Sequence, residues 1–109
     1  MVTSAPREHE DVFRAIADPT RRQILTLLRP GARTVGDIAT NFRTSRPAIS
    51  KHLRLLRSAG LVTTTKRGTA RVCELNAAPL REVNQWLKDY EALWDEKLSS
   101  LKKFVEENP

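Results

Sequence analysis

The stretch TSRPAISKHLRLLRSAGLV, from Thr44 to Val62, decides the fold. Its apolar residues Ile49, Leu53 and Leu56 follow one another at spacings of four and three, which predicts one face of a helix that packs on a core. The remaining face carries basic and hydroxyl side chains, namely Arg46, Ser50, Lys51, Arg54 and Arg57. We therefore expect a helix with a buried apolar side and an exposed basic side.

Both ends of this helix have recognisable signals. Thr44 or Ser45 can cap its N-terminus, and Pro47 still lies in the first turn, where a missing backbone N–H costs nothing. Gly60 adopts the left-handed conformation readily, so it can end the helix.

Positive charge is concentrated around the same helix. Residues 29 to 71 contain ten Lys or Arg and a single acid, Asp37, whereas the rest of the chain has nine basic and twelve acidic residues. The net charge of +6 thus comes entirely from this window. Because each phosphate neutralised by Lys or Arg releases condensed counterions, a local surplus of this kind is typical of a protein that binds a polyanion. DNA, RNA and an anionic membrane surface are the partners that this charge allows.

Length and composition set further bounds. The 109 residues suffice for one domain and are too few for two. No long apolar run and no signal-peptide pattern occurs, so we expect a cytoplasmic protein without a membrane partner. The single cysteine, Cys73, cannot form an intrachain disulfide. The polar residues 1–7 are predicted to be flexible.

Three shorter helices are expected before the basic one. Apolar residues recur at helical spacing from Val12 to Ala17, which indicates the first. The second begins at Asp18-Pro19 or at Thr20, since both Asp and Thr can cap a helix, and it ends before Pro30-Gly31. Thr34 can cap a short third helix that ends near residue 41. With the basic helix, this gives a helix pair over residues 34–59.

A hairpin and a long helix are expected after the basic helix. Leu61 to Thr65 and Ala70 to Leu75 have β-type composition and are joined by Lys66-Arg67-Gly68-Thr69, which predicts a two-stranded hairpin over residues 61–75 with a basic tip. From about residue 78 to residue 106 one helical pattern runs without a breaker. Its apolar residues are spaced like a heptad repeat: Leu80, Val83, Leu87, Tyr90, Trp94, Leu101 and Phe104.

The predicted long helix exceeds the size of the domain. It would span roughly 43 Å at the usual rise per residue. A compact chain of this length has a radius of gyration of about 13 Å, hence a diameter of roughly 34 Å. Its far apolar residues therefore need a partner chain.

These strings resemble the ArsR family of bacterial winged helix-turn-helix repressors. The matching elements are VFRAIADPTRRQILTLL, TVGDIAT, SRPAISKHLRLLRSAGLV and KRGTARV, which together cover about residues 12 to 76. The aromatic residues Trp86, Tyr90 and Trp94 on the last helix resemble the metal-independent, autorepressor-like branch. The resemblance implies a mainly α fold with a small β-hairpin as the wing and a long C-terminal dimerisation helix. It also implies a homodimer that binds double-stranded DNA at an imperfect palindrome.

The resemblance and the geometry of the major groove assign roles to residues. The groove admits one α-helix, whose N-terminal residues reach base edges. Base reading is expected from Arg46, Ser50 and Lys51. Contacts to the DNA backbone or from the wing are expected from Thr44, Ser45, Arg54, Arg57, Lys66, Arg67 and Arg71. The dimer interface is expected to contain Val12, Phe13, Val83, Trp86, Leu87, Tyr90, Trp94 and Leu101. The aromatic residues among them fit a dimer core better than a small-molecule pocket.

No cofactor or metal is expected. Metal-sensing relatives need a Cys pair in the helix that here reads TVGDIATN, or His and carboxylates on the last helix, and this sequence has neither arrangement. Cys73 among apolar neighbours is interpreted as a small buried hydrophobe, with thiol sensing the lesser alternative. His52 adjoins the apolar Leu53 and is interpreted as structural rather than as a switch. The sequence does not reveal a small-molecule effector.

Three other function classes are weighed. An enzyme finds no support, because the sequence lacks a phosphate-binding loop, a nucleophile with a recognisable base and a carboxylate pair. A protein-binding module that uses the long helix predicts binding insensitive to salt and to DNA sequence. A sequence-blind nucleic-acid binder predicts a steep salt dependence with no preferred site.

Overall fold

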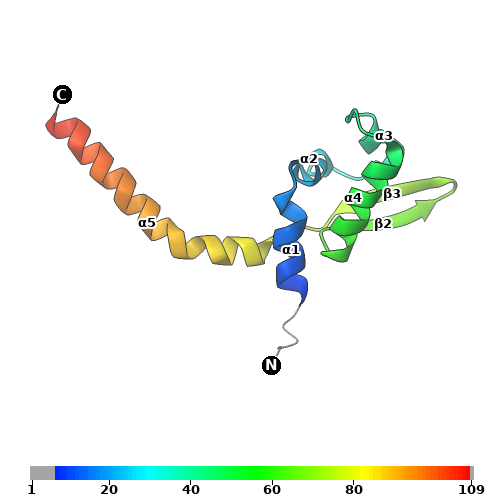
Figure 1. Cartoon of the computed structure of the whole chain (residues 1–109), viewed down its shortest axis with the longest axis horizontal. Helices are drawn as coiled ribbons and strands as arrows, with labels where there is room; N and C mark the ends of the chain where they lie inside the picture. Colours follow the sequence, from blue (N-terminus) through cyan, green and yellow to red (C-terminus); the bar gives the residue numbers. More distant parts are fainter. Residues whose placement is uncertain (1–6, 109) are drawn as a thin grey trace.

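The computed structural model describes residues 7–108, with side chains from Val12 onward. In this part of the chain the elements follow in the order α1 (Arg7–Ala17), α2 (Pro19–Leu28), β1 (Arg33–Thr34), α3 (Val35–Ala39), α4 (Arg46–Ser58), β2 (Val62–Arg67), β3 (Ala70–Leu75) and α5 (Leu80–Glu107) (Figure 1). The predicted fold class, mainly α with a small hairpin, is confirmed. The predicted flexibility of residues 1–7 concerns residues that lie outside the described part of the chain, except Arg7, which is the first residue of α1.

The junction between α1 and α2 is fixed by Asp18. Its carboxylate Oδ2 accepts a hydrogen bond from the backbone N–H of Arg21 at 3.0 Å, and Pro19 occupies the first helical position. Of the two starts that the sequence allows, Asp18 is therefore the cap and Thr20 is inside the helix.

We expect Asp18→Ala to lower the free energy of unfolding by about 1 kcal/mol at neutral pH, the usual value of an N-cap. The backbone hydrogen bond from Arg21 lowers the pKa of Asp18, and partial burial opposes this. The charge of Arg21, and that of His52 when its ring is protonated, lower this pKa further. Because the folded-state pKa is below that of the unfolded chain, this stabilisation is present above about pH 4 and is lost as the pH falls through the folded-state pKa.

Urea unfolding of the wild type and of Asp18→Ala, followed from pH 7 to pH 3, measures this effect. The difference between the two should shrink over the acidic part of that range. Asp18→Asn keeps an oxygen acceptor, so at pH 7 it should lower the free energy of unfolding less than Asp18→Ala does. A difference that stays constant down to pH 3 would contradict the assignment of the cap.

The third helix is shorter than predicted. Thr34 caps it by accepting a hydrogen bond from the N–H of Asp37 at 3.0 Å, but α3 ends at Ala39, and tighter turns carry the chain through Phe42. A strand that the sequence did not predict, β1, precedes this helix. It pairs antiparallel with β3, so the sheet has the order β1-β3-β2.

The helix α4 has the predicted start, end and buried face. Ser45 caps it through the N–H of Ala48. At the other end, Gly60 has a φ of 77°. There the N–H groups of Gly60 and Leu61 donate to the carbonyls of Arg57 and Leu56, both at 2.9 Å, which is the pattern of a Schellman motif.

The hairpin spans residues 62–75, close to the predicted 61–75, but its first strand extends further toward the turn and its turn is shorter than predicted. Arg67 pairs with Ala70, so Lys66 and Arg67 lie in strand β2 rather than in the connecting loop. Only Gly68 and Thr69 form the turn. Gly68 has a φ of 63° and Thr69 does not have a positive φ, which is the φ pattern of a type II′ turn.

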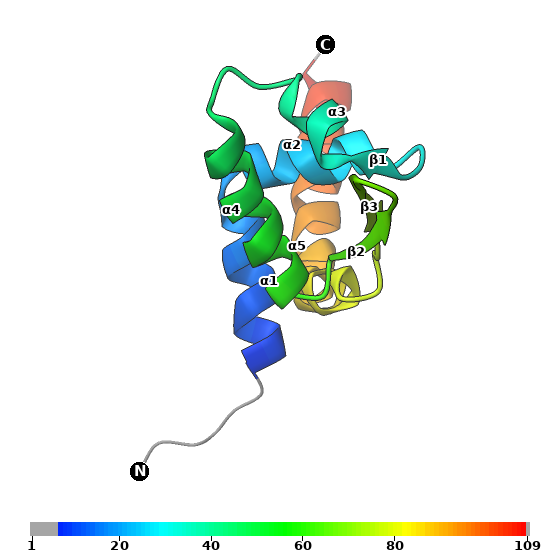
Figure 2. The same cartoon turned by 90° about the vertical axis from the view of Figure 1, so that its right-hand side faces the viewer.

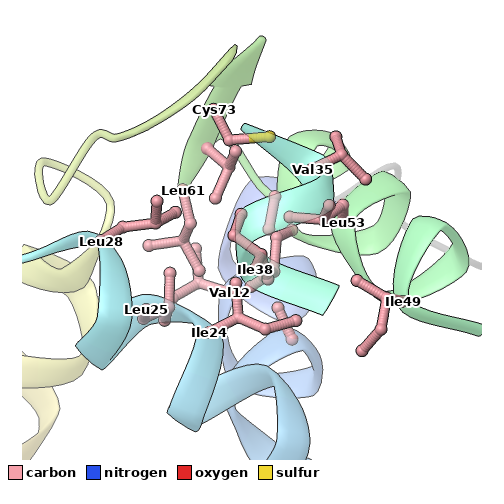
Figure 3. Packing of buried hydrophobic residues seen from close by; sticks show 14 residues of the cluster. Val12, Ile24, Leu25, Leu28, Val35, Ile38, Ile49, Leu53, Leu61 and Cys73 are labelled. Atoms are coloured by element: carbon pink, nitrogen blue, oxygen red, sulfur yellow. The ribbon is translucent and has the colours of Figure 1, made fainter. Parts of the chain in front are cut away.

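The hydrophobic core joins α1, α2, α3, α4 and the sheet. Its buried residues are Val12, Ala15, Ile24, Leu25, Leu28, Val35, Ile38, Ile49, Leu53, Leu56, Ala59, Leu61, Val62 and Cys73. Figure 3 shows the labelled side chains of α2, α3 and α4 converging with Leu61 and Cys73. The core therefore holds α4 by one face only.

The helix α5 extends away from this core. It begins at Leu80, two residues after the predicted start, and ends at Glu107, one residue after the predicted end. None of its residues is buried. Figure 1 shows it leaving the body on the side opposite to the β2–β3 hairpin. The radius of gyration is 18.8 Å, well above the value of about 13 Å for a compact chain of this length. Within residues 7–108, the structure has no helix both long and apolar enough to cross a membrane.

Candidate nucleic-acid interface

The predicted base-reading residues lie on the surface. Arg46 and Lys51 are exposed and Ser50 is half-buried, while Ile49 between them is fully buried. Figure 2 shows α4 on the near side of the molecule with α1 and α2 behind it. This helix therefore presents its basic face outward.

A groove separates the start of α4 from the hairpin. Its volume is about 450 Å³, and it is lined by Thr34, Val35, Gly36, Arg46, Ser50, Thr69, Ala70 and Arg71. Arg46 reaches toward the start of α3, since a Cβ added to Gly36 would lie 3.7 Å from Nη2 of Arg46. The fold thus brings Arg46, Ser50 and Arg71 together, whereas Lys51 does not line this groove.

Further along α4, a smaller hollow of about 70 Å³ lies between the helix and the sheet. It brings Arg54, Arg57 and Arg71 near one another, with Cys73 among the lining residues. Cys73 is fully buried, and its Sγ lies 3.8 Å from Oγ1 of Thr64. The interpretation of Cys73 as a small buried residue of the core is confirmed.

The other predicted contacts lie on either side of these hollows. Thr44 and Ser45 are exposed at the start of α4, and Lys66 and Arg67 are exposed near the end of the hairpin. Ser45 also caps α4, so its hydroxyl oxygen already accepts one hydrogen bond.

The cations of this surface are not neutralised by neighbouring acids. Among the residues that the structure describes, no salt bridge involves Arg46, Lys51, Arg54, Arg57, Lys66, Arg67 or Arg71. Arg33 differs from them, because its Nε donates a hydrogen bond at 3.0 Å to the carbonyl oxygen of Leu27 in the last turn of α2. The surface formed by α4 and the hairpin therefore keeps a positive field that a polyanion can neutralise.

His52 faces the inside of the molecule rather than the groove. Its Nδ1 lies 3.2 Å from Nη1 of Arg21 and 3.9 Å from Oδ2 of Asp18. The interpretation of His52 as a structural residue agrees with this position. Sequence reasoning missed Arg21 as its partner and missed Gly36 and Thr69 as lining residues, because these contacts depend on the packing of separate elements. Among the side chains described, those of residues 12–108, no three His, Cys, Asp or Glu lie close enough together to hold a metal ion.

The residues predicted to form the dimer interface differ in how exposed they are in the single chain. Val12 is only 1% exposed and belongs to the core of its own chain. This position contradicts the prediction that Val12 lies in the dimer interface. Phe13 packs edge to face on Trp86, with ring centroids 5.7 Å apart, and Trp86 packs on Tyr90 at 5.2 Å. Val83 and Leu87 are half-buried, whereas Trp94 and Leu101 are more than half exposed.

An apolar stripe runs along α5 toward its C-terminus. We define the α5 stripe as the exposed residues Trp86, Tyr90, Leu93, Trp94, Leu98, Leu101, Phe104 and Val105. At 100° per residue these positions fall on one side of the helix. A stripe of this length that stays exposed in one chain is typical of a surface that another chain covers.

Comparison with known proteins identifies the family. Residues 18–64 match the model of the bacterial regulatory protein, arsR family. The chain is 41% identical to the transcriptional repressor SdpR of Bacillus subtilis (strain 168) over 80 residues, which are 73% of this chain and 89% of SdpR. The chain belongs to the ArsR family of bacterial regulatory proteins.

Solved structures of ArsR-family proteins have the same architecture. The crystal structure of the ArsR family transcriptional regulator RHA00566 superposes with a TM-score of 0.74 at 34% identity and covers 86% of this chain and 97% of that one. The homodimeric winged helix-turn-helix DNA-binding domain of Mb0332 from Mycobacterium bovis superposes with a TM-score of 0.64 at 28% identity and covers 84% and 92%. This ArsR-family chain is thus a winged helix-turn-helix DNA-binding transcriptional regulator, not an enzyme.

Proposed function

We propose that the chain is a homodimeric repressor that acts in the cytoplasm and binds an imperfectly palindromic operator without a metal. The observation that carries this proposal is the outward position of Arg46, Ser50 and Lys51 on a helix whose opposite face is buried. The major groove of B-DNA is about 12 Å wide and admits one such helix. The name and likeness of SdpR, a transcriptional repressor, support the repressing role.

In this proposal two sets of residues have different tasks. Arg46 and Lys51 donate to guanine O6 and N7, and Ser50 can serve a donor or an acceptor on a base edge. Thr44, Ser45, Arg54, Arg57, Lys66, Arg67 and Arg71 bind phosphates or, from the hairpin, the minor groove. Phosphate contacts supply affinity and register, whereas the base contacts supply sequence preference.

The α5 stripe supports the homodimer. The part of the dimer interface close to the core would contain Phe13, Trp86 and Tyr90. The part toward the C-terminus of α5 would contain Trp94 and Leu101. The homodimeric state of Mb0332 also supports it. A two-fold axis would place two copies of α4 in successive major grooves about 34 Å apart, which is why the operator should be a palindrome.

Selection of bound fragments from the genome of the source organism, repeated at two salt concentrations, tests the proposal. We expect a preferred site with two-fold symmetry and an affinity that falls steeply with salt. A steep salt dependence with no preferred site would show a sequence-blind binder instead. Binding to a protein, insensitive to salt and DNA sequence, would show that α5 serves a docking module.

We expect Arg46→Ala and Lys51→Ala to lower the ratio of operator affinity to random-DNA affinity by roughly tenfold each, because each removes a base contact. Arg67→Ala should weaken binding to both DNAs alike and reduce the salt slope by about one. Titrations of the selected operator and of a random duplex at several salt concentrations measure both effects.

Lys103→Ala is the control for these three variants, because Lys103 is an exposed basic residue near the end of α5, away from α4 and the hairpin. It should leave both affinities unchanged. Equal losses on operator and random DNA for all three variants would contradict the division into base-reading and phosphate-binding residues.

A further inference from the structure

The side chain of Arg21 links three helices. It belongs to α2, and its Nε and Nη2 donate to the carbonyls of Ala15 at 2.7 Å and Arg14 at 3.0 Å, near the end of α1. Its Nη1 lies 3.2 Å from Nδ1 of His52 on α4. One planar guanidinium thus contacts both the helix before it and the helix that faces DNA.

The contact between Arg21 and His52 has a defined direction. A guanidinium has N–H donors and no acceptor, so Nδ1 of His52 accepts the hydrogen bond. The neutral His52 ring therefore carries its proton on Nε2. A side chain without an acceptor at the position of Nδ1 cannot replace it.

The position of this contact connects the two functional surfaces. His52 directly follows Lys51 on α4, next to the proposed base-reading residues. On the other side, α1 carries Phe13, whose ring packs on Trp86 of α5. Arg21 thus lies between the helix that meets DNA and the helices of the proposed dimer interface.

We propose that Arg21 and His52 are positioning residues for DNA binding, which hold α4 at one fixed orientation relative to α1. This inference rests on the proposed homodimer. In a dimer, the orientation of each α4 relative to the interface sets the separation and angle of the two copies, so it selects the spacing of the operator half-sites. When the contact is lost, α4 keeps its base-reading side chains but samples more orientations.

Arg22 provides a matched control. Its Nη1 donates to the carbonyls of Ile16 at 2.8 Å and Ala17 at 3.2 Å, so it also bonds the end of α1. In the described structure it makes no hydrogen bond to α4. Arg21→Met and Arg22→Met therefore both remove two bonds to α1, and only Arg21→Met removes the link to His52.

The experiment measures half-site spacing. The probes are the operator selected by the wild-type protein, versions with one or two base pairs added or removed between its half-sites, and a random duplex. We expect the wild type and Arg22→Met to prefer one spacing. At that spacing, the affinity of Arg21→Met should be about tenfold below that of the wild type, which is the usual scale for losing a hydrogen bond from a charged group. Arg21→Met should also bind all spacings with similar affinity. Its affinity for the random duplex should stay within about twofold of that of Arg22→Met.

A second pair of variants tests the same contact without removing Arg21. His52→Asn places an oxygen acceptor near the position of Nδ1, whereas His52→Leu has similar size and no acceptor. We expect His52→Asn to keep the spacing preference and His52→Leu to lose it. If Arg21→Met does not fold, this pair of variants still tests whether the contact between Arg21 and His52 sets the spacing preference.

Two results would overturn the inference while leaving the proposed function intact. The first is an equal effect of Arg21→Met and Arg22→Met on spacing, which would mean that Arg21 only bonds the end of α1. The second is an equal effect of His52→Asn and His52→Leu. A wild-type protein that is monomeric, or that shows no preferred site, would instead overturn the proposed function, and this inference would fail with it.

Discussion

Trp94→Glu combined with Leu101→Glu should produce a folded monomer whose operator affinity is roughly 100- to 1000-fold below that of the wild type. Both side chains belong to the α5 stripe, are 54% and 58% exposed in the single chain and lie outside its hydrophobic core, so the substitutions remove no core packing. In the proposed dimer they would place two carboxylates in an apolar interface, where unpaired charges are expensive to bury. The loss of affinity follows because the second half-site is no longer bound by a linked partner.

Analytical ultracentrifugation and operator titration measure this result, and circular dichroism checks the helix content. Gln85→Glu combined with Ser99→Glu adds the same charge on the other side of α5 and should leave both the dimer and the affinity unchanged. A double variant of the stripe that remains dimeric would show that another surface forms the dimer.

Leu56→Ala should lower the free energy of unfolding by about 3 kcal/mol. Leu56 is fully buried in the core, so its truncation removes packing and leaves a cavity. A loss of this size is a large part of the total stability of a small domain. Urea unfolding at one fixed protein concentration measures it, because the stability of a dimer depends on concentration.

The neighbouring residue provides the control. Leu55 is 39% exposed, about 100° around α4 from Leu56, and Leu55→Ala should lower the free energy of unfolding by less than about 1 kcal/mol. Similar losses for the two variants would show that the buried side of α4 is wrongly assigned.

Features that depend on a few neighbouring residues could be predicted from the sequence. The buried face of α4, its cap at Ser45 or Thr44 and its end at Gly60 are of this kind, since each depends on residues within one or two helical turns. The choice between alternative caps needed the structure, because both Asp18 and Thr20 have suitable side chains.

Features that depend on distant pairing could not be predicted. The strand β1 has only two residues, too few for an apolar period, and it exists because Arg33 and Thr34 pair with β3. Likewise, α1 turns Val12 toward the core and leaves Phe13 to contact Trp86, and periodicity alone did not separate these neighbours.

The candidate site shows the same division. The basic residues of α4 were predicted from their spacing, but the groove that joins Arg46 and Ser50 to Arg71 depends on how the hairpin packs beside the helix. The link from Arg21 to His52 spans 31 positions in the chain and has no local signal.

The separation of the two faces of α4 has a consequence for how such regulators diverge. Ile49, Leu53 and Leu56 hold the helix in place, while Arg46 and Lys51 contribute nothing to the core. Exchanges at these exposed positions can change which promoter is recognised while the protein stays folded. New targets can therefore be acquired through a few surface mutations, and selection on folding and selection on specificity act on different residues of the same thirteen-residue helix.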